Sequence, residues 1–351
     1  MAGKKKKVFI AVSGGVDSST AAALLLREGC DCAGIFMITC DHGRQAKADA
    51  ERIAEKLNIK LHVLDLRGDF EKILDYFCSE YKKARTPNPC AFCNWYVKFG
   101  KLINFAQDKG ADLLATGHYA RIAKSDKGTG LYQAVDTAKD QSYALAMINR
   151  DILEHIILPM GDYSKKRTRE MAATFGLGLE EKQESQEICF IPNDDYVAVL
   201  EQRCPQLVRR GNIVDSSGTI LGEHNGIHRF TIGQRRGLRV AMGRPYYVVK
   251  LDAETNTVTL GPKEELMHKT LTATNLNWLV DEPVSAFRAK VKIRYNSPGV
   301  SALVLPKADT AIVEFDVPVS AITPGQLAVF YIEDQFGSRV TGGGWIDKVG
   351  D

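Results

Sequence analysis

The first 200 residues alternate regularly between short apolar runs and longer amphipathic segments. Apolar runs of this length predict buried strands, and the amphipathic segments after them predict helices. Strands are expected at 8–12, 32–37, 61–66 and 113–116, and helices at 20–28, 46–57, 70–81 and 97–109. This alternation is typical of a parallel sheet wound with helices on both faces, which binds ligands at the carboxyl ends of its strands. We therefore expect an α/β domain over residues 1–200.

Beyond Cys204 the pattern changes to short β-branched runs that are separated by Gly, Pro and Asn. These runs lie at 246–251, 258–260, 286–295, 311–315 and 327–332. Such spacing predicts all-β structure: a small β-rich central domain at 201–275, then a C-terminal β-barrel at 276–351. Asp281-Glu282-Pro283 is the expected linker between them.

A glycine-containing string, Ser13-Gly14-Gly15-Val16-Asp17-Ser18-Ser19, lies between the first expected strand and the first expected helix. Adjacent glycines let the backbone approach a polyanion, and the free N–H groups and positive dipole end of a new helix attract it. A Walker loop would carry Gly-Lys-Ser or Gly-Lys-Thr, and this string has no lysine. The string predicts a phosphate site with Asp17 as a candidate Mg²⁺ ligand; the alternative is a tight turn with serine at the helix start.

Composition narrows the class of protein. Of the 351 residues, 44% are hydrophobic and 25% charged, and no apolar run approaches the roughly 20 residues that span a bilayer. Lys4 to Lys7 precede an apolar stretch too short for a secretion signal, so we expect a cytoplasmic protein without a membrane partner. The net charge of +3 is small, but the basic excess is concentrated in residues 201–272.

The eight cysteines are expected to stay reduced, as buried thiols, metal ligands or catalysts. Cys90 and Cys93 lie in Thr86-Pro87-Asn88-Pro89-Cys90-Ala91-Phe92-Cys93-Asn94, and their spacing is typical of metal-binding knuckles and redox pairs. Cys189 lies in Glu184-Ser185-Gln186-Glu187-Ile188-Cys189-Phe190. The remaining ones are interpreted as small packing residues: Cys30, Cys32, Cys40, Cys78 and Cys204.

The phosphate string resembles the PP-loop of the ATP pyrophosphatase superfamily, whose members cleave ATP between the α and β phosphates. Together with the cysteine strings, three further motifs resemble those of the bacterial tRNA-specific 2-thiouridylases, the MnmA/TrmU family. They are Ala115-Thr116-Gly117-His118-Tyr119-Ala120-Arg121, Lys139-Asp140-Gln141-Ser142-Tyr143 and Thr231-Ile232-Gly233-Gln234-Arg235-Arg236-Gly237-Leu238. The resemblance covers nearly the whole chain. It implies an adenine-nucleotide α-hydrolase-like parallel sheet domain, followed by the two β-rich domains.

The resemblance also implies an activity, the ATP-dependent replacement of the C2 oxygen of the wobble uridine (position 34) of tRNA by sulfur. ATP, with Mg²⁺, would adenylate that oxygen, because a ureide-type carbonyl is a poor electrophile until its oxygen can leave. Cys189 would take sulfur as a persulfide from a sulfur carrier or cysteine desulfurase relay. Cys93 would be the partner nucleophile, which leaves a disulfide between the two. ATP would be held by Ala11, Val12, Ser13, Gly14, Gly15, Val16, Asp17, Ser18, Met37 and Gly117.

By the same resemblance, tRNA would contact residues of both the first domain and the barrel. These residues are Asn88, Pro89 and Cys90 around the target base, His118, Asp140, Gln141 and Ser142, and Arg294, Tyr295 and Gln326 in the barrel. From the residues alone, a lone histidine such as His118 is as well explained by a purely structural hydrogen bond.

A row of cations in the barrel region offers a second indication of RNA. Arg288, Lys290, Lys292 and Arg294 alternate with apolar residues, which places all four on one face of a strand. Together with Arg229, Arg235, Arg236 and Arg239 they would form a track for RNA phosphates. The alternative is an ordinary solvated strand face.

Cys90 departs from the family pattern, since well-known members carry an aspartate there. The role of that aspartate cannot be transferred to a thiol. Cys90, Cys93 and Cys189 could instead bind three irons of a [4Fe–4S] cluster whose fourth iron carries hydrosulfide, so the persulfide and cluster routes both stay open. A zinc knuckle lacks an evident fourth ligand.

Two other functions fit parts of the sequence. An amidating ligase of the NAD or GMP synthetase kind would use the same loop, but it gives no role to the paired thiols or the basic β-rich half. A non-catalytic iron–sulfur RNA-binding protein would use the cysteines and arginines but not the loop. We expect a monomer or a weak dimer.

Overall fold

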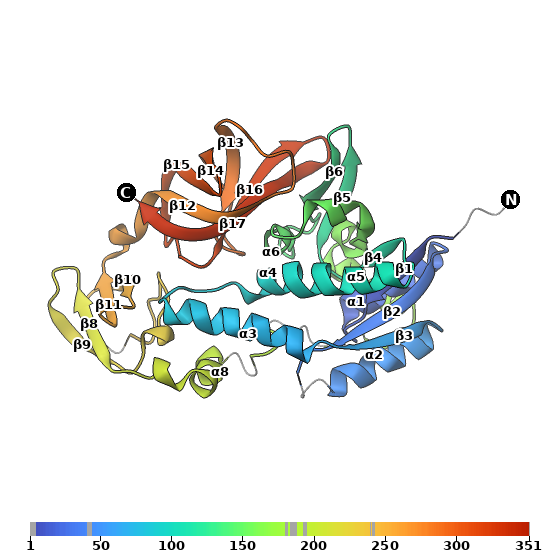
Figure 1. Cartoon of the computed structure of the whole chain (residues 1–351), viewed down its shortest axis with the longest axis horizontal. Coiled ribbons are helices and arrows are strands. Elements are labelled where there is room, and N and C mark those ends of the chain that lie inside the picture. Colours follow the sequence, from blue (N-terminus) through green and yellow to red (C-terminus); the bar gives the residue numbers. More distant parts are fainter. Residues whose placement is uncertain are drawn as a thin grey trace.

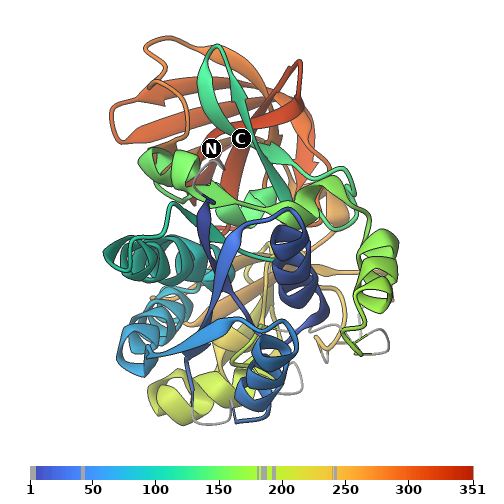
Figure 2. The ribbon, with the colours of Figure 1, turned by 90° about the vertical axis from the view of Figure 1, so that its right-hand side faces the viewer.

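The structure is a computed structural model, shown in two views at right angles in Figures 1 and 2. It describes residues 5–40, 44–179, 182, 188–191, 195–238, 240 and 243–350. These ranges form a parallel α/β domain, a small central sheet and a C-terminal barrel, which confirms the predicted fold class. Among the helices in these ranges, none has the length and apolar character needed to cross a membrane.

A five-stranded parallel sheet with the order β3-β2-β1-β4-β7 forms the centre of the first domain. Its strands are β1 (Lys7–Ala11), β2 (Asp31–Ile38), β3 (Lys60–Asp65), β4 (Leu113–Ala115) and β7 (Ile156–Ile157). Alternate residues of β1 enter two separate cores: Phe9 packs on one face, and Val8 and Ile10 pack on the other. Burial of both faces explains why the strands read as continuous apolar runs.

Helices cover both faces of this sheet (Figure 2). On one side lie α1 (Val16–Arg27), α2 (Arg44–Lys56) and α7 (Lys165–Thr174), which belong to the core around Ile10. On the other side, α3 (Arg67–Lys82) and α5 (Leu102–Asp108) pack around Phe9. The helical segments expected at 20–28, 46–57 and 70–81 are therefore confirmed, with α1 beginning earlier than predicted.

The helix expected at 97–109 also begins earlier, at Pro89. It runs through α4 (Pro89–Cys93), the π-helical segment η1 (Asn94–Lys101) and α5. The Asn88 side chain accepts a hydrogen bond of 3.1 Å from the Ala91 N–H, and Pro89 has the backbone angle that a first helical turn requires. This start places Cys90 and Cys93 at the beginning of a long helix.

The central domain is a four-stranded sheet with the order β10-β11-β8-β9. Its strands are β8 (Gly211–Asp215), β9 (Ile220–His224), β10 (Tyr247–Asp252) and β11 (Thr257–Gly261). Val248, Val258 and Leu260 form a small core with Ile213 and Phe230. Helix α8 (Tyr196–Arg203) precedes this sheet and packs on α3, where Cys78 and Cys204 are buried together.

The last domain is a closed six-stranded barrel, because β12 pairs with both β15 and β17. Its strands are β12 (Met267–Trp278), β13 (Phe287–Lys292), β14 (Val300–Lys307), β15 (Thr310–Ser320), β16 (Leu327–Asp334) and β17 (Gly337–Gly350). Leu271 and Ala273 of β12 are buried in the barrel core. The expected linker at 281–283 is thus wrong: it connects two barrel strands, and the predicted boundary at 275 falls inside β12.

A hairpin that the apolar pattern does not reveal connects the first domain to the barrel. It consists of β5 (Ala120–Ser125) and β6 (Gly128–Gln133), and β6 pairs with β17. Arg121 donates to the Phe336 carbonyl at 2.7 Å, and the Tyr132 hydroxyl donates to Asp334 at 2.8 Å. Within the described ranges, the remaining short helices are α6 (Ser142–Leu145) and the 3-10 turns at 150–155, 159–162, 205–207, 227–229 and 263–266.

Candidate active site

The loop between β1 and α1 has the geometry of a phosphate site. Gly14 has a φ of +73°, and a β-carbon on it would lie 2.7 Å from Cβ of Asp49 in α2. The Ser18 hydroxyl accepts a hydrogen bond of 3.1 Å from the Ser13 N–H and lies 3.1 Å from the Ser13 hydroxyl. Only glycine fits the position of Gly14, so the backbone itself forms the surface of this turn.

Among the residues that the structure describes, no side chain caps the start of α1. The first bond of its ladder runs from the Ser19 N–H to the Gly15 carbonyl at 3.2 Å. The N–H groups of Val16, Asp17 and Ser18 consequently have no acceptor within the helix. Unused donors at the positive end of a helix dipole attract anions, and the phosphates of ATP fit this chemistry.

Of the two residues expected on the adenine and ribose side, Gly117 lies against this helix start. A β-carbon on Gly117 would lie 2.7 Å from the Ser18 nitrogen and 2.9 Å from the Asp17 carbonyl carbon. Met37 is half-buried near the carboxyl end of β2, the strand beside β1. The structure therefore brings Gly117 to the loop and Met37 to the neighbouring strand end.

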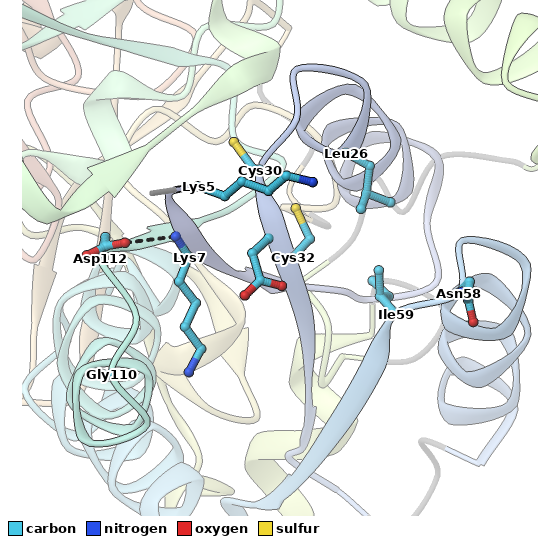
Figure 3. A pocket seen from close by; sticks show the side chains of 10 residues that line it. Lys5, Lys7, Leu26, Cys30, Cys32, Asn58, Ile59, Gly110 and Asp112 are labelled. Atoms are coloured by element: carbon cyan, nitrogen blue, oxygen red, sulfur yellow. Dashed lines mark hydrogen bonds between the residues drawn. The ribbon is translucent and has the colours of Figure 1, made fainter. Parts of the chain in front are cut away.

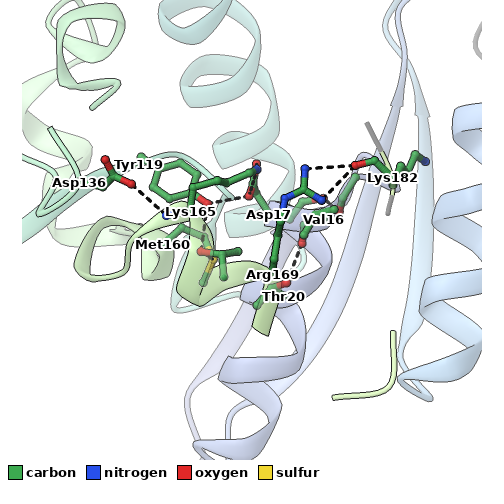
Figure 4. A network of polar contacts seen from close by, with 12 residues as sticks. Val16, Asp17, Thr20, Tyr119, Asp136, Met160, Lys165, Arg169 and Lys182 are labelled. Carbon is green, nitrogen blue, oxygen red and sulfur yellow. Dashed lines mark hydrogen bonds and ion pairs between the residues drawn. The ribbon is translucent and has the colours of Figure 1, made fainter. Parts of the chain in front are cut away.

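A lysine from a distant part of the chain reaches the loop (Figure 4). Lys165, at the start of α7, places its Nζ 2.6 and 2.8 Å from the two carboxylate oxygens of Asp17. The Tyr119 hydroxyl donates to the same carboxylate at 2.8 Å. Asp17, the candidate Mg²⁺ ligand, is thus held by a cation and a phenol.

Lys182 reaches the other side of the loop. Its Nζ donates to the Gly14 carbonyl at 3.0 Å and to Asp49 at 2.5 Å. This hydrogen bond to Lys182, opposed by burial, lowers the pKa of the Asp49 carboxyl. Arg169 in turn donates to the Lys182 carbonyl at 3.3 Å from each of two guanidinium nitrogens. Sequence reasoning missed Lys165 and Lys182, because neither lies in a motif near the loop.

The predicted thiols come from two segments that share one neighbourhood. Cys90 and Cys189 are exposed, Cys93 is half-buried, and all three are free thiols. Desolvation by the surrounding protein raises the pKa of each, that of Cys189 to about 12, and Cys93 and Cys90 contribute to the rise at Cys189. Their mutual electrostatic influence places the three thiols in one neighbourhood, and the joint action of Cys93 and Cys189 on one substrate atom stays a prediction.

The positively charged side chain of Lys98 lies near the three thiols and also contacts His118. Its charge lowers the pKa of all three thiols, against the larger effect of desolvation. Its Nζ lies 3.4 Å from Nε2 of His118, whose Nδ1 lies 2.7 Å from Oγ1 of Thr116. Burial, and secondly the charge of Lys98, holds the pKa of His118 well below its usual value, so the ring is neutral near pH 7.

The three thiols do not form a prepared metal cage. Within the described ranges, no group of three or more His, Cys, Asp or Glu side chains is arranged to hold a metal ion. Each iron of a [4Fe–4S] cluster binds its own thiolate, so the [4Fe–4S] alternative needs three thiols around a cluster and not around a single ion. That alternative stays a hypothesis, which iron content tests.

The loop that precedes the thiols is anchored by the barrel. Gln326 donates from Nε2 to the carbonyls of Thr86 and Pro87, both at 3.0 Å. Gly325 has a φ of +92°, and a β-carbon there would lie 2.7 Å from the Thr86 carbonyl oxygen. Gln326 is expected to contact tRNA. In the structure it instead holds the backbone of the segment Pro87-Asn88-Pro89, which leads to Cys90.

The expected tRNA contacts at 140–142 are internal in this structure. The buried Asp140 carboxylate accepts hydrogen bonds from the Ala134 N–H at 3.1 Å and the Ser142 hydroxyl at 2.9 Å. The Ser142 hydroxyl also lies 3.1 Å from the Tyr331 hydroxyl of the barrel, and Gln141 accepts from the Tyr119 N–H at 2.9 Å. These side chains join the first domain to the barrel, and their contact with tRNA stays a prediction.

The four cations at 288, 290, 292 and 294 contact groups of the protein itself, so they do not form a continuous surface for RNA phosphates. Apolar residues do alternate with it, but Arg288 pairs with Asp316 and Lys290 lies 3.5 Å from Glu333. Lys292 is partly buried, 3.9 Å from Asp140. Arg294 donates to the carbonyls of Ile232 at 2.9 Å and Ala321 at 3.0 Å, so it ties the central domain to the barrel. Beside it, Tyr295 is exposed; Arg239 lies outside the described residues.

A cavity of about 600 Å³ lies at the other end of the sheet, where β1 and β2 begin (Figure 3). Lys7, Cys30, Cys32 and Asp112 are among its lining residues, and the Lys7 N–H donates to Asp112 at 2.8 Å. Parallel sheets bind ligands at the carboxyl ends of their strands, so this cavity is separate from the PP-loop site. Burial raises the pKa of Cys32 to about 12, in agreement with a packing role.

Three family models match successive parts of the chain. They are the tRNA methyl transferase HUP domain at 6–193, the tRNA methyl transferase PRC-barrel domain at 198–262 and the aminomethyltransferase beta-barrel domain at 268–346. The tRNA-specific 2-thiouridylase MnmA of Carboxydothermus hydrogenoformans is 44% identical over 363 residues, which cover 98% of each chain. The chain belongs to the family of tRNA-specific 2-thiouridylases.

A second member of this thiouridylase family, from Syntrophotalea carbinolica, is also 44% identical, over 98% of this chain and 99% of its own. Among solved structures, the U34-tRNA thiolase NcsA from Methanococcus maripaludis with its [4Fe-4S] cluster is 18% identical. Its TM-score is 0.37, over 59% of this chain and 68% of that chain, which is too low to carry an inference. Membership of the thiouridylase family confirms the resemblance carried by the loop and cysteine motifs.

Proposed function

We propose that this protein catalyses the ATP-dependent 2-thiolation of the wobble uridine, position 34, of tRNA. One observation supports it beyond family membership: two adjacent residues, Gly117 and His118, lie at the expected nucleotide site and near the thiols, respectively. Gly117 lies against the Asp17–Ser18 backbone of the PP-loop, and His118 lies 3.4 Å from Lys98 in the helix that carries Cys93. A uridine placed between them would meet both the activating nucleotide and the thiols.

The loop would hold ATP through its backbone. The N–H groups of Val16, Asp17 and Ser18 would bind the phosphates, and Asp17 would hold Mg²⁺. Bound Mg²⁺ neutralises charge on the leaving pyrophosphate. Transfer of AMP to the C2 oxygen of the uridine then converts that oxygen into part of a good leaving group.

The thiols would deliver sulfur in two balanced steps. The terminal sulfur of a Cys189 persulfide attacks C2 and displaces AMP, which joins Cys189 to the base through two sulfur atoms. Cys93 thiolate then attacks the Cys189 sulfur and releases the base as 2-thiouridine. A Cys93–Cys189 disulfide remains, and an external dithiol must reduce it before the next turnover. A sulfur carrier or cysteine desulfurase relay would supply the persulfide sulfur.

The neutral His118 ring suits a site that receives RNA. A neutral imidazole offers one donor and one acceptor nitrogen, and its environment sets which nitrogen carries the proton. An uncharged uridine needs such partners when it leaves the stack of the anticodon loop. We assign His118 to the pocket that receives the target base.

The experiment supplies purified protein with ATP, Mg²⁺, an unmodified tRNA transcript and a persulfide donor, and measures 2-thiouridine by mass spectrometry of nucleosides. Cys93→Ser and Cys189→Ser should each abolish thiolation while AMP transfer to the tRNA stays measurable. Cys30→Ser, which alters a thiol in the cavity at the other end of the sheet, is the matched control and should keep full activity. Retained thiolation in either active-site variant would refute the assigned roles.

The same assay separates the rival functions. An amidating ligase would form AMP and pyrophosphate from ATP without tRNA, in the presence of an acid substrate and ammonia. A non-catalytic RNA-binding protein would bind tRNA but form no AMP. Thiolation of the transcript excludes both.

A further inference from the structure

The ion pair at the PP-loop is in an unusual position for a purely structural contact. Asp17 lies in the first turn of α1, where the unused N–H groups face an incoming phosphate. Lys165 Nζ contacts both oxygens of its carboxylate, and the two side chains are 13% and 32% exposed for Lys165 and Asp17. A negative group thus stands where a polyanion must bind, and a lysine from another helix balances it.

The second lysine–aspartate pair at this loop provides a comparison. Asp49 lies beneath Gly14, and it accepts hydrogen bonds from Gln45, Arg52 and Lys182. Its carboxylate is only 10% exposed, so its partners already use most of its accepting capacity. This pair supports the turn from below. The Asp17 side chain is more exposed, at 32%, and lies at the helix start, the side on which a ligand binds.

The charges at the loop must be rebalanced when a nucleotide binds. In this structure, Asp17 is balanced by Lys165 and Asp49 by Lys182. The pyrophosphate part of ATP adds several negative charges, and an unaltered Asp17 would repel them. Mg²⁺ on Asp17 removes that repulsion and at the same time releases Lys165. The PP-loop string has no lysine of its own, and Lys165 lies close enough to replace it.

We propose that Lys165 is a phosphate-binding residue, and that nucleotide binding exchanges its partner: Asp17 passes from Lys165 to Mg²⁺, and Lys165 passes from Asp17 to the pyrophosphate part of ATP. This deepens the proposed function and presupposes it. Tyr119 keeps the carboxylate in place during the exchange, because its hydroxyl lies 2.8 Å from Asp17 and 3.0 Å from Thr168. The ring of Tyr119 also lies 5.6 Å from the lysine Nζ, which keeps the cation near the loop.

The test measures binding of inorganic pyrophosphate to the full-length protein by calorimetry, with and without Mg²⁺. Wild-type protein should bind more tightly with Mg²⁺. Lys165→Met should weaken binding of magnesium pyrophosphate by about 10- to 100-fold, the loss expected for a charge-assisted hydrogen bond. Lys165→Arg keeps the charge and should bind within a few-fold of wild type. The neighbouring, exposed Lys166 provides the matched control: Lys166→Met should bind as wild type does.

Asp17→Asn gives the decisive result. Without the carboxylate, Lys165 loses its ion pair with Asp17 and the negative charge at the helix start is gone, so this variant should bind magnesium-free pyrophosphate more tightly than wild type and gain little from added Mg²⁺. Wild-type affinity in Lys165→Met, or no gain for magnesium-free pyrophosphate in Asp17→Asn, would overturn the exchange. If wild-type protein binds neither ATP nor pyrophosphate, the proposed function itself fails, which is a different outcome. The Asp17→Asn result does not depend on the folding of Lys165→Met.

Discussion

Gly117→Ala should disrupt the nucleotide loop through one added methyl group. The new β-carbon would lie 2.7 Å from the Ser18 nitrogen, whereas ordinary contacts begin at 3.4 Å. Both close neighbours are backbone atoms of α1, so no side chain can rotate away. Overpacking of this kind costs about 1–3 kcal/mol. In a domain of this size, each kcal/mol lowers Tm by about 2–4 °C.

The same displacement should weaken nucleotide binding. The start of α1 must move away from Gly117, and it carries the N–H groups of Val16, Asp17 and Ser18 that are expected to bind the phosphates. We expect the Kd for ATP to rise at least about 10-fold, since charge-assisted hydrogen bonds depend strongly on geometry. Thermal unfolding and calorimetric titration with ATP measure the two effects.

Gly68→Ala is the matched control for this experiment. Gly68 lies in α3, and a β-carbon there would meet no atom within 4 Å. Alanine forms helix better than glycine by about 0.5–1 kcal/mol, so Tm should stay the same or rise, with unchanged ATP affinity. A Gly117→Ala protein with the Tm and ATP affinity of the wild type would refute the inferred contact between Gly117 and the PP-loop.

Two further predictions concern the thiol neighbourhood. If the persulfide route is correct, Cys90→Ser should keep thiolation and anaerobically purified wild-type protein should be active without iron; iron in the wild-type protein, with loss of both iron and thiolation in Cys90→Ser, would instead favour the cluster route. The His118 ring should titrate well below pH 6.5 in NMR spectra of histidine-labelled protein, because burial lowers its pKa. A depressed histidine pKa means that the unfolded chain binds the proton more readily, so stability should fall as the pH drops below 6.5. A titration midpoint near 6.5 in the folded protein would contradict the burial of this ring.

The sheet and its helices could be predicted because their apolar residues have a clear period. Val8 to Val12 form one continuous apolar run, since both faces of β1 are covered. The hairpin at 120–133 could not be recognised in this way, because its polar residues contact the barrel through Arg121 and Tyr132. The early start of the thiol helix did have a signal: Asn88 followed by Pro89 is a cap and first-turn pair.

The PP-loop and the three thiols could be predicted because each lies in a compact string. Lys165 and Lys182 could not, since 148 residues separate Lys165 from Asp17 and 168 separate Lys182 from Gly14. Only the fold brings these two lysines to the loop. Arg294 shows the opposite error: its alternating pattern suggests a free cation, but carbonyl groups of Ile232 and Ala321 surround its guanidinium.

The anchor that Gln326 provides for the Thr86–Pro87 backbone has a consequence for synthesis of the protein. The two partners lie 240 residues apart in the chain. At a translation rate of about 5–20 residues per second, the segment leading to Cys90 waits roughly 10–50 s on the ribosome before Gln326 is made. The thiol loop is therefore fastened late in synthesis, and a nascent chain can form the PP-loop well before it completes the site that handles sulfur.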